Sequence, residues 1–248
     1  MATQDLLIEI GTEELPPKAL KSLALAFQNS LAEQLTNAEL SFSEINYFAT
    51  PRRLALIVRQ LQDSQAEKTI ERLGPNITAA TDKAGNPSKA AIGFAKSCGV
   101  NFADLSEKET DKGTRLAYYL KQAGKSVHEL LPAMTSNALN SLPIPKRMRW
   151  GSLRDAFVRP IHWLVMLYGQ DTIPCELFGV TADRISYGHR FHHPQAITLE
   201  GIDSYQQQLA DAHVLVDFQQ RQETIKNQIL AIFFRQTFFY VNPFHVFS

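Results

Sequence analysis

Runs of apolar and polar residues divide the chain into short strands and amphipathic helices. Residues 5–10 (DLLIEI) are almost continuously apolar and predict a short buried strand that ends at Gly11. Thr12 is then a candidate N-cap, followed by two acids and two prolines at the start of a helix. The next segment, 18–35, has helical spacing and predicts one buried face: Leu20, Leu23, Ala24, Phe27, Leu31 and Leu35.

The same patterns predict further elements along the chain. Arg52 and Arg53 lie at a turn after Pro51 that enters a strand over 54–58, and residues 68–73 are the predicted partner strand. Ser88 and Gly99 are typical of the two ends of a helix over 89–98. A helix is predicted over 127–142, a buried strand or helix over 161–167, and a short strand over 214–216. Asp217 is a candidate cap for a final helix.

Strands and helices mix without steady alternation, which favours an α+β fold of short elements in two packed subdomains. We expect an N-terminal α/β unit over 1–75, an α+β region with a basic aromatic segment over 76–232, and an aberrant Phe-rich tail over 233–248.

Composition narrows the class of protein. The chain of 248 residues has zero formal net charge, so the molecule as a whole has no general attraction to nucleic acid or acidic membranes. Cys98 and Cys175 lie in no metal-ligand spacing and are expected to be reduced. The start of the chain does not resemble a signal peptide, and no apolar run reaches about 18 residues. We therefore expect a cytoplasmic protein.

The charge is unevenly distributed, however. Residues 1–45 contain seven acids and two bases, whereas residues 144–163 (IPKRMRWGSLRDAFVRPIHW) contain five bases, one acid and both tryptophans. Guanidinium groups pair with phosphates and ring faces accept bases, so this segment is a candidate nucleic-acid surface. The alternative is a solvated basic loop that leads into a buried element.

Two other clusters of residues are candidate sites. Glu13 and Glu14 could bind a metal or an amine, although adjacent acids at a helix start are more often partners of the helix dipole. His189, His192 and His193 form the densest histidine cluster, but no nearby carboxylate or Cys pair has zinc-site spacing. The sequence contains no GxGxxG or GxxxxGK[ST] phosphate loop, and we predict no catalytic residue and no metal site.

Several long blocks together resemble the beta subunit of the bacterial two-subunit glycyl-tRNA synthetase. The blocks are LLIEIGTEELPPKAL (6–20), ATPRRLAL (49–56), GNPSKAAIGFAKSCG (85–99), PKRMRWG (145–151), FVRPIHWLV (157–165) and GHRFH (188–192). They are collinear with the N-terminal part of that subunit from about Leu6 to about Ile232. The resemblance implies that a separate alpha subunit carries the class II active site, which uses ATP and Mg²⁺. The beta subunit would contribute tRNA binding within an α2β2 ligase and bind no cofactor of its own.

The resemblance directs attention to seven candidate RNA contacts. These are Arg52, Arg53, Lys146, Arg147, Arg149, Trp150 and Arg159, with Trp150 in a stacking or packing role. The alternative for each arginine is an intramolecular ion pair with the acidic N-terminal segment. Trp163 is expected in the core.

The sequence also departs from the family pattern. Family members are much longer, and residues 233–248 contain six phenylalanines and no acid. We expect a frameshift or a premature end, and a fragment that is inactive on its own. Two alternatives to tRNA binding are a module that only binds the alpha subunit, and a hydrolase that edits mischarged tRNA with the GHRFHH cluster.

Overall fold

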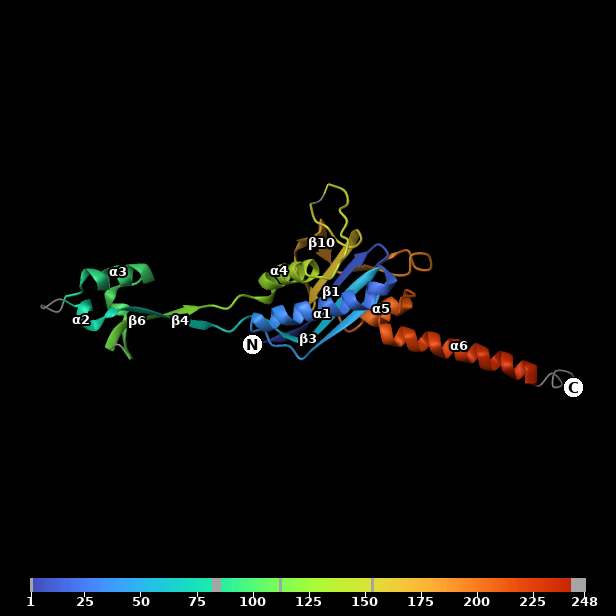
Figure 1. Ribbon diagram of the computed structural model, residues 1–248, viewed down its shortest axis with the longest axis horizontal. Coiled ribbons are helices and arrows are strands. Elements are labelled where there is room, and N and C mark those ends of the chain that lie inside the picture. Colours follow the sequence, from blue (N-terminus) through green and yellow to red (C-terminus); the bar gives the residue numbers. More distant parts are fainter. Residues whose placement is uncertain (1, 82–85, 112, 153, 242–248) are drawn as a thin grey trace. The chain divides into compact units, whose positions relative to one another are not determined.

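A computed structural model describes residues 2–81, 86–111, 113–152 and 154–241 (Figure 1). The chain forms two compact units. Unit 1 comprises Met1–Ser64 and Ser126–Ser248, and unit 2 comprises Gln65–Lys125. These limits differ from the predicted boundary at residues 75 and 76, because the chain leaves unit 1 at Ser64 and returns at Ser126. A division into consecutive segments cannot represent such an insertion.

Unit 1 is built on a seven-stranded sheet with the order β2-β3-β1-β7-β10-β9, in which β8 also pairs with β7. The strands are β1 (Thr3–Thr12), β2 (Glu44–Thr50), β3 (Arg53–Gln62), β7 (Ile161–Tyr168), β8 (Asp171–Thr172), β9 (Glu176–Leu177) and β10 (Val180–Asp183). Strand β1 is central and pairs antiparallel with both β3 and β7. Only the β7–β10 pair is parallel among the described strands of this sheet.

Helices cover one face of this sheet. They are α1 (Leu20–Asn37), which follows a 3-10 turn at Pro17–Ala19, and α4 (Val127–Asn140). All six apolar positions predicted for the first helix are buried in the core between α1 and the sheet. The amphipathic prediction is therefore confirmed, although Thr12 is not the cap. Thr12 ends β1, and Ala19 occupies the N-cap of α1.

The opposite face of the sheet packs against a second, smaller core. A hairpin of β11 (Ile185–Tyr187) and β12 (Ala196–Thr198) precedes α5 (Tyr205–Asp211), and both elements contribute to this side of unit 1. The core contains Leu7 of β1 and Trp163 of β7 beside Tyr205 and Leu209 of α5. Because β1 is buried on both faces, residues 6–10 (LLIEI) are apolar at every position but Glu9 rather than alternating.

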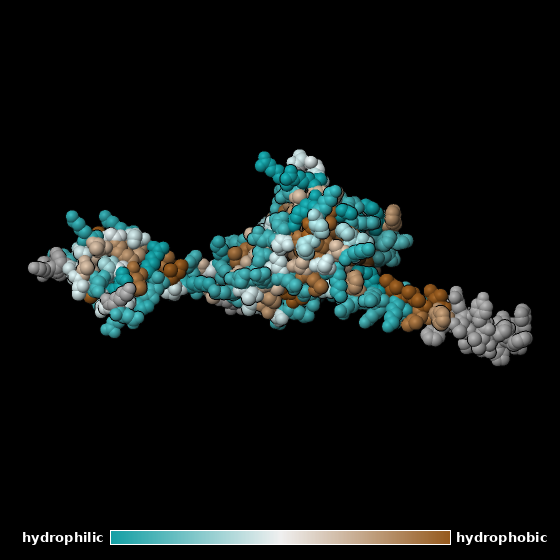
Figure 2. All heavy atoms as spheres, viewed as in Figure 1, coloured by the Kyte–Doolittle hydropathy of each residue, from teal (hydrophilic) through white to brown (hydrophobic). Residues whose placement is uncertain are grey.

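Helix α6 (Phe218–Val241) ends the described chain. Its first turn is capped by the Asp217 carboxylate, which accepts a hydrogen bond from the amide of Gln220 and so confirms the predicted cap. Further along, α6 exposes apolar side chains that appear brown in Figure 2: Ile225, Ile229, Leu230, Ile232 and Phe233. The helix covers the first part of the predicted aberrant tail, and residues 242–248 lie outside the described residues.

Unit 2 is a three-stranded antiparallel sheet with two short helices. The strands are β4 (Lys68–Asn76), β5 (Ser106–Thr110) and β6 (Gly113–Gln122) in the order β4-β6-β5, and the helices are α2 (Ile77–Ala80) and α3 (Lys89–Cys98). A further 3-10 turn spans Phe102–Asp104. The predicted caps of α3 are confirmed, since Ser88 accepts a hydrogen bond from the amide of Ala91 and Gly99 is left-handed.

Two predicted strand features are wrong. Residues 68–73 do form a strand, but it pairs with β6 and not with the strand over 54–58, which pairs with β1 and β2. Residues 214–216 form no strand, although the Val216 carbonyl accepts a hydrogen bond from the amide of Ala49. The α+β class itself is confirmed. Within the described ranges, no helix is both long and apolar enough to cross a membrane.

Candidate anion-binding site

The site in unit 1 lies above a buried carboxylate, Glu9 of β1, whose side chain is fully shielded from solvent. Glu9 accepts hydrogen bonds from the indole N–H of Trp163 and from the hydroxyls of Ser186 and Tyr205. Its fourth partner is Arg53, with Nη1 3.2 Å from Oε2. Burial, followed by the charge of Glu9, raises the pKa of Tyr205 well above its usual value of about 10. We call these five residues the Glu9 network.

Arg53 is paired within this network through its two terminal nitrogens, although its buried Nε has no hydrogen-bond partner. Its guanidinium also donates to the Ser186 hydroxyl at 3.3 Å and to the Tyr187 carbonyl, and only 2% of its side chain is exposed. Such a buried, paired guanidinium is not available to a phosphate. The expectation that Arg53 contacts RNA is therefore corrected to the alternative, an ion pair with the acidic N-terminal segment.

Trp163 links the network to the surface above it. A Cβ on Gly11 of β1 would come within 1.8 Å of the indole ring, so only glycine lets the ring lie against this strand. The guanidinium carbons of Arg52 and Arg53 lie 5.7 and 5.6 Å from the ring centroid, and the Tyr187 ring lies 5.0 Å away. The indole is thus a shared wall between the Glu9 network and the cavity above it.

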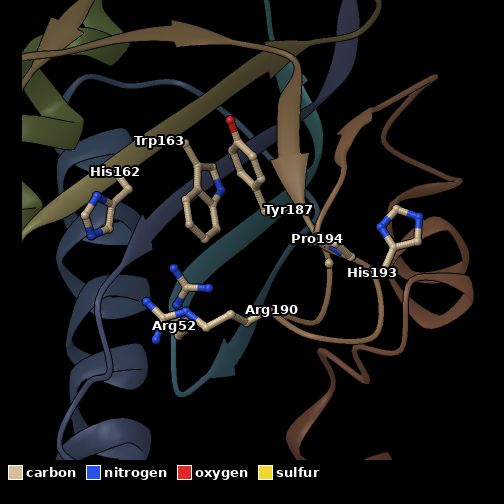
Figure 3. Close-up of a pocket in the computed structure, with 8 residues that line it drawn as sticks. Arg52, His162, Trp163, Tyr187, Arg190, His193 and Pro194 are labelled. Atoms are coloured by element: carbon tan, nitrogen blue, oxygen red, sulfur yellow. The ribbon is translucent and has the colours of Figure 1, made fainter.

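That cavity, the Arg52–Arg190 pocket, has a volume of about 250 Å³ (Figure 3). Its lining comes from four places in unit 1: the turn between β2 and β3, strand β7, the end of β11, and the loop that follows it. The residues are Arg52, His162, Trp163, Tyr187, Gly188, Arg190, His193 and Pro194. None of these eight described residues is acidic, so the wall presents two guanidinium and two imidazole groups.

Arg52 differs from Arg190, the other arginine of the pocket, in having no ion pair with a described carboxylate. It is half-buried, its Nε has no hydrogen-bond partner, and none of the described carboxylates forms an ion pair with it. Burial lowers the pKa of Arg52, and the nearby charge of Arg190 lowers it further, while Glu13 and Glu14 partly offset both effects. His193 Nδ1 is also buried without a partner. An incoming anion would satisfy these groups.

Arg190 is held differently, by the carboxylate of Glu13. Its Nη2 lies 3.0 and 3.3 Å from the two Glu13 oxygens, and His162 Nε2 lies 3.2 Å from one of them. Glu13 is itself anchored through its amide, which donates to the Pro160 carbonyl. Glu13 therefore pairs with cations of the pocket and is not a partner of the α1 dipole.

The loop 188–194 that carries Arg190 is shaped by its histidines. His189 Nδ1 accepts hydrogen bonds from the amides of Phe191 and His192, and the His189 amide donates to the Ala212 carbonyl. Phe191 is 80% exposed at the turn. Among the described residues, no group of three or more His, Cys, Asp or Glu side chains could hold a metal ion. The histidines therefore order the loop.

Two further cavities adjoin the pocket through shared residues. One, of about 330 Å³, is lined by Arg52, Arg221 and residues 188–191, among others. The other, of about 720 Å³, is lined by Arg159 and Arg190 together with residues 13–17 and Pro51. Arg159 donates from Nε to the Glu14 carbonyl at 3.0 Å, which places its guanidinium on this surface. Arg52, Arg159 and Arg190 thus line adjoining cavities, whose walls also carry the acids Glu13 and Glu14.

The remaining candidates lie in the segment before β7. Lys146 and Arg149 are exposed, whereas Trp150 is half-buried and packs against the main core. Arg147 donates to three carbonyls, those of Asn140, Leu142 and Ala156, and so closes the C-terminal end of α4. Its guanidinium is occupied by the fold. The structure brings Arg52 and Arg159 together, and it leaves Lys146 and Arg149 as solvated charges.

Three residues that meet at one carboxylate of the site are not among the predicted RNA contacts. Arg190, His162 and Glu13 all lie within sequence blocks that had been singled out for other reasons: GHRFH for its histidines, FVRPIHWLV for its apolar run, and LLIEIGTEELPPKAL for its helix start. The sequence signal for each of them is only that its block contains an ionisable residue. No feature of the neighbouring sequence indicates that the three side chains meet.

Known proteins match the chain across the sequence blocks that carry these residues. A family model described as glycyl-tRNA synthetase beta subunit matches residues 6–241. This match extends beyond residue 232, into the segment predicted to be aberrant.

Curated relatives carry the same name. The glycine–tRNA ligase beta subunit of Chromohalobacter salexigens is 50% identical over 231 residues, which are 93% of this chain and 33% of the relative. Those of Hahella chejuensis and Pseudomonas aeruginosa are 48% and 44% identical, over 94% of this chain and 34% and 33% of each relative. The chain thus spans about a third of the length of these relatives. From the match over almost its whole length, the chain belongs to the glycyl-tRNA synthetase beta subunit family.

Proposed function

We propose that this chain contributes tRNA binding to the synthesis of glycyl-tRNA, as part of the beta subunit of a glycine–tRNA ligase. The observation that carries the proposal is the family match over residues 6–241. In this proposal the alpha subunit holds the ATP- and Mg²⁺-dependent active site, and this chain supplies no catalytic residue. Its partners are the alpha subunit, in an α2β2 assembly, and tRNA(Gly). A cytoplasmic location belongs to the same proposal.

Four basic residues of unit 1 support a role in holding RNA. Arg52 and Arg159 line adjoining cavities, and the exposed Lys146 and Arg149 lie in the segment that leads to β7. Guanidinium and ammonium groups in this state pair readily with backbone phosphates, which carry most of the affinity of proteins for nucleic acids. We assign Arg147 and Trp150 a supporting role, because the first caps α4 and the second packs against the core.

The test is the affinity of the full chain for tRNA(Gly) at two salt concentrations. If about four phosphates are contacted, affinity should fall about a hundredfold between 50 and 200 mM salt. The variant K146E/R149E should bind about tenfold more weakly and show a smaller salt slope, since each lost contact reduces the slope by about one. Both positions are exposed, so the fold should be unaffected.

The matched control is K89E/K96E, which changes the net charge equally at exposed positions of α3 in unit 2. It should retain most of the affinity. Equal losses in the two variants would mean that the binding responds only to net charge, and an affinity independent of salt would reject phosphate contact altogether.

A second candidate is a module that binds the alpha subunit and makes no RNA contact. The observation that favours it is the apolar surface of α6, where five large side chains from Ile225 to Phe233 are 42–63% exposed. Faces of this kind are usually covered by protein. Co-purification with the alpha subunit in the absence of tRNA, abolished in I225E/I229E, would support this role. Retained co-purification in that variant would exclude the α6 surface.

A further inference from the structure

The Arg52–Arg190 pocket combines charges that the folded protein leaves unbalanced. Its described lining has two guanidinium groups and no carboxylate. Glu13 forms an ion pair with Arg190 from outside this lining, whereas Arg52 forms no ion pair with a described carboxylate. The charges of Glu13 and Glu14 only partly offset the effects of burial and of Arg190 on Arg52. Desolvating a cation without a paired anion costs free energy, which a bound anion would recover. Within the fold, the Arg52 guanidinium contacts the Trp163 ring.

The unsatisfied polar atoms indicate the same kind of ligand. Arg52 Nε and His193 Nδ1 are both buried without hydrogen-bond partners, and both belong to residues that line this pocket. Buried polar groups in native proteins are almost always hydrogen-bonded, so two such atoms at one cavity point to a ligand with several oxygen atoms. His193 would serve either as donor or as acceptor, since its neutral ring has one of each.

We propose that the pocket binds the 5′-terminal phosphate of an RNA strand, a phosphomonoester, and that Glu13 is a resident carboxylate exchanged for it. This inference rests on the proposed function and names the part of the RNA that the pocket takes. A phosphomonoester carries a charge of about −1.5 to −2 at pH 7 and three acceptor oxygens. It therefore matches two guanidinium groups, whereas an internal phosphodiester, with a single charge, matches one.

The size and walls of the cavity fit this ligand. Its volume of about 250 Å³ lies below the range of about 300–1,000 Å³ that is usual for whole small molecules. A phosphate and its ribose would fit, and the rest of the strand would remain outside. The rings of Trp163 and Tyr187 lie beside one another in the lining (Figure 3), and the sugar would pack against them.

The exchange of Glu13 is favoured by its exposure. The side chains of Glu13 and Arg190 are 34% and 48% exposed, and ion pairs in such positions contribute little stability. A dianion held by both Arg52 and Arg190 would replace the single carboxylate and satisfy Arg52 as well. Glu13 would then keep His162 as its nearest basic group.

The experiment compares tRNA(Gly) that carries a 5′-phosphate with the same RNA that carries a 5′-hydroxyl, using the full chain. We expect the phosphorylated RNA to bind about tenfold more tightly, which corresponds to one additional charge-assisted contact of the kind that guanidinium groups make. R190Q should abolish this difference. E13Q should enlarge it several-fold, because the resident carboxylate no longer competes.

Matched controls make the same chemical changes elsewhere. R72Q removes an exposed arginine of β4 in unit 2, and E33Q removes an exposed acid of α1. Both should keep the wild-type difference between the two RNAs. Inorganic phosphate and adenosine 5′-monophosphate, each added at millimolar concentration, test whether the pocket also binds a phosphate group that is not part of an RNA strand. Removal of the wild-type preference by either compound, with no effect on R190Q, would assign the pocket to the phosphate group itself.

The possible results separate the two proposals. If both RNAs bind equally well, the pocket proposal is rejected and the tRNA-binding function stands. If neither RNA binds, the proposed function fails. The proposal that the pocket binds the 5′-phosphate of an RNA is then rejected too, whether or not inorganic phosphate and adenosine 5′-monophosphate bind. If R72Q loses the preference as fully as R190Q does, the preference reflects net charge and the pocket is not its origin.

Discussion

Arg52 and Arg53 are adjacent in sequence, yet they belong to two regions of unit 1 with opposite electrostatic properties. Arg53 lies in the Glu9 network, where it forms an ion pair with a carboxylate and its terminal nitrogens also donate to a hydroxyl and a carbonyl. Arg52 lies in the Arg52–Arg190 pocket, where it forms no ion pair with a described carboxylate and the charge of Arg190 opposes its own. Both contact the same Trp163 ring, and the Nε of each is buried without a partner. Burial alone therefore does not distinguish a structural arginine from a ligand-binding one, whereas the presence of a paired carboxylate does.

The two acids of these regions differ in the same way. Glu9 is fully buried and accepts hydrogen bonds from four side chains, so removing any one of them leaves a buried carboxylate short of a donor, and removing Arg53 also leaves its charge without a cation. Glu13 is partly exposed and has two basic partners. Solvent can replace those partners at small cost. We therefore expect large effects on stability in the first region, and effects mainly on binding in the second.

The largest effect should come from separating the buried ion pair. R53M leaves Glu9 charged, buried and without its cation, which should lower the free energy of unfolding by about 3–5 kcal/mol. Urea denaturation followed by circular dichroism measures this loss. The double variant E9Q/R53M should recover a large part of it, because both charges are gone. A loss below about 1 kcal/mol in R53M would mean that the network is not the electrostatic centre of the fold.

A smaller effect is expected from the Tyr205 hydroxyl. Y205F removes one donor to Glu9 and should cost about 1.5–3 kcal/mol at neutral pH, the usual contribution of a hydrogen bond to a charged group. The pKa of Tyr205 is raised in the folded state, so the wild type should lose stability as the pH rises above about 10, where only the unfolded phenol ionises.

Denaturation midpoints between pH 8 and 11 test this dependence. Y205F should lose less stability over this range than the wild type. Y168F should reduce the loss to a lesser degree, since burial raises the pKa of Tyr168 less strongly. If Y205F retains the full alkaline loss of the wild type, the Tyr205 phenol does not remain protonated inside the network.

The smallest change in stability, and the sharpest contrast with R53M, is expected for R52M. Methionine fills similar space without a desolvated charge, so the free energy of unfolding should stay within about 1 kcal/mol of the wild type or rise. The variant also loses the contact with the Trp163 face, which contributes about 0.5–1 kcal/mol, so this is the largest decrease in the free energy of unfolding that we expect. The same variant should lose the preference for 5′-phosphorylated tRNA. Destabilisation comparable to that of R53M would mean that both arginines stabilise the fold and that the proposed difference between them is wrong.

Local features of the fold could be predicted because they depend on residues close in sequence. The buried face of α1, the Ser88 and Gly99 caps of α3 and the Asp217 cap of α6 are of this kind. Each requires only a helical repeat or a side chain within a few residues of a backbone amide. The partner of the 68–73 strand could not be predicted locally, because unit 2 is inserted between β3 and α4 and supplies its own third strand.

By itself, the sequence determined the class of fold, the caps of α3 and α6, the position of Arg52 and Arg53 at a strand entrance, and the blocks that identify the family. Only the tertiary structure decided which of the two arginines is paired with a buried carboxylate. The partners of Glu9 lie 44, 154, 177 and 196 residues away, and Glu13 lies 177 residues from Arg190. Such pairings depend on which strands become neighbours in the sheet, and this is set by packing over the whole of unit 1 rather than by any local pattern.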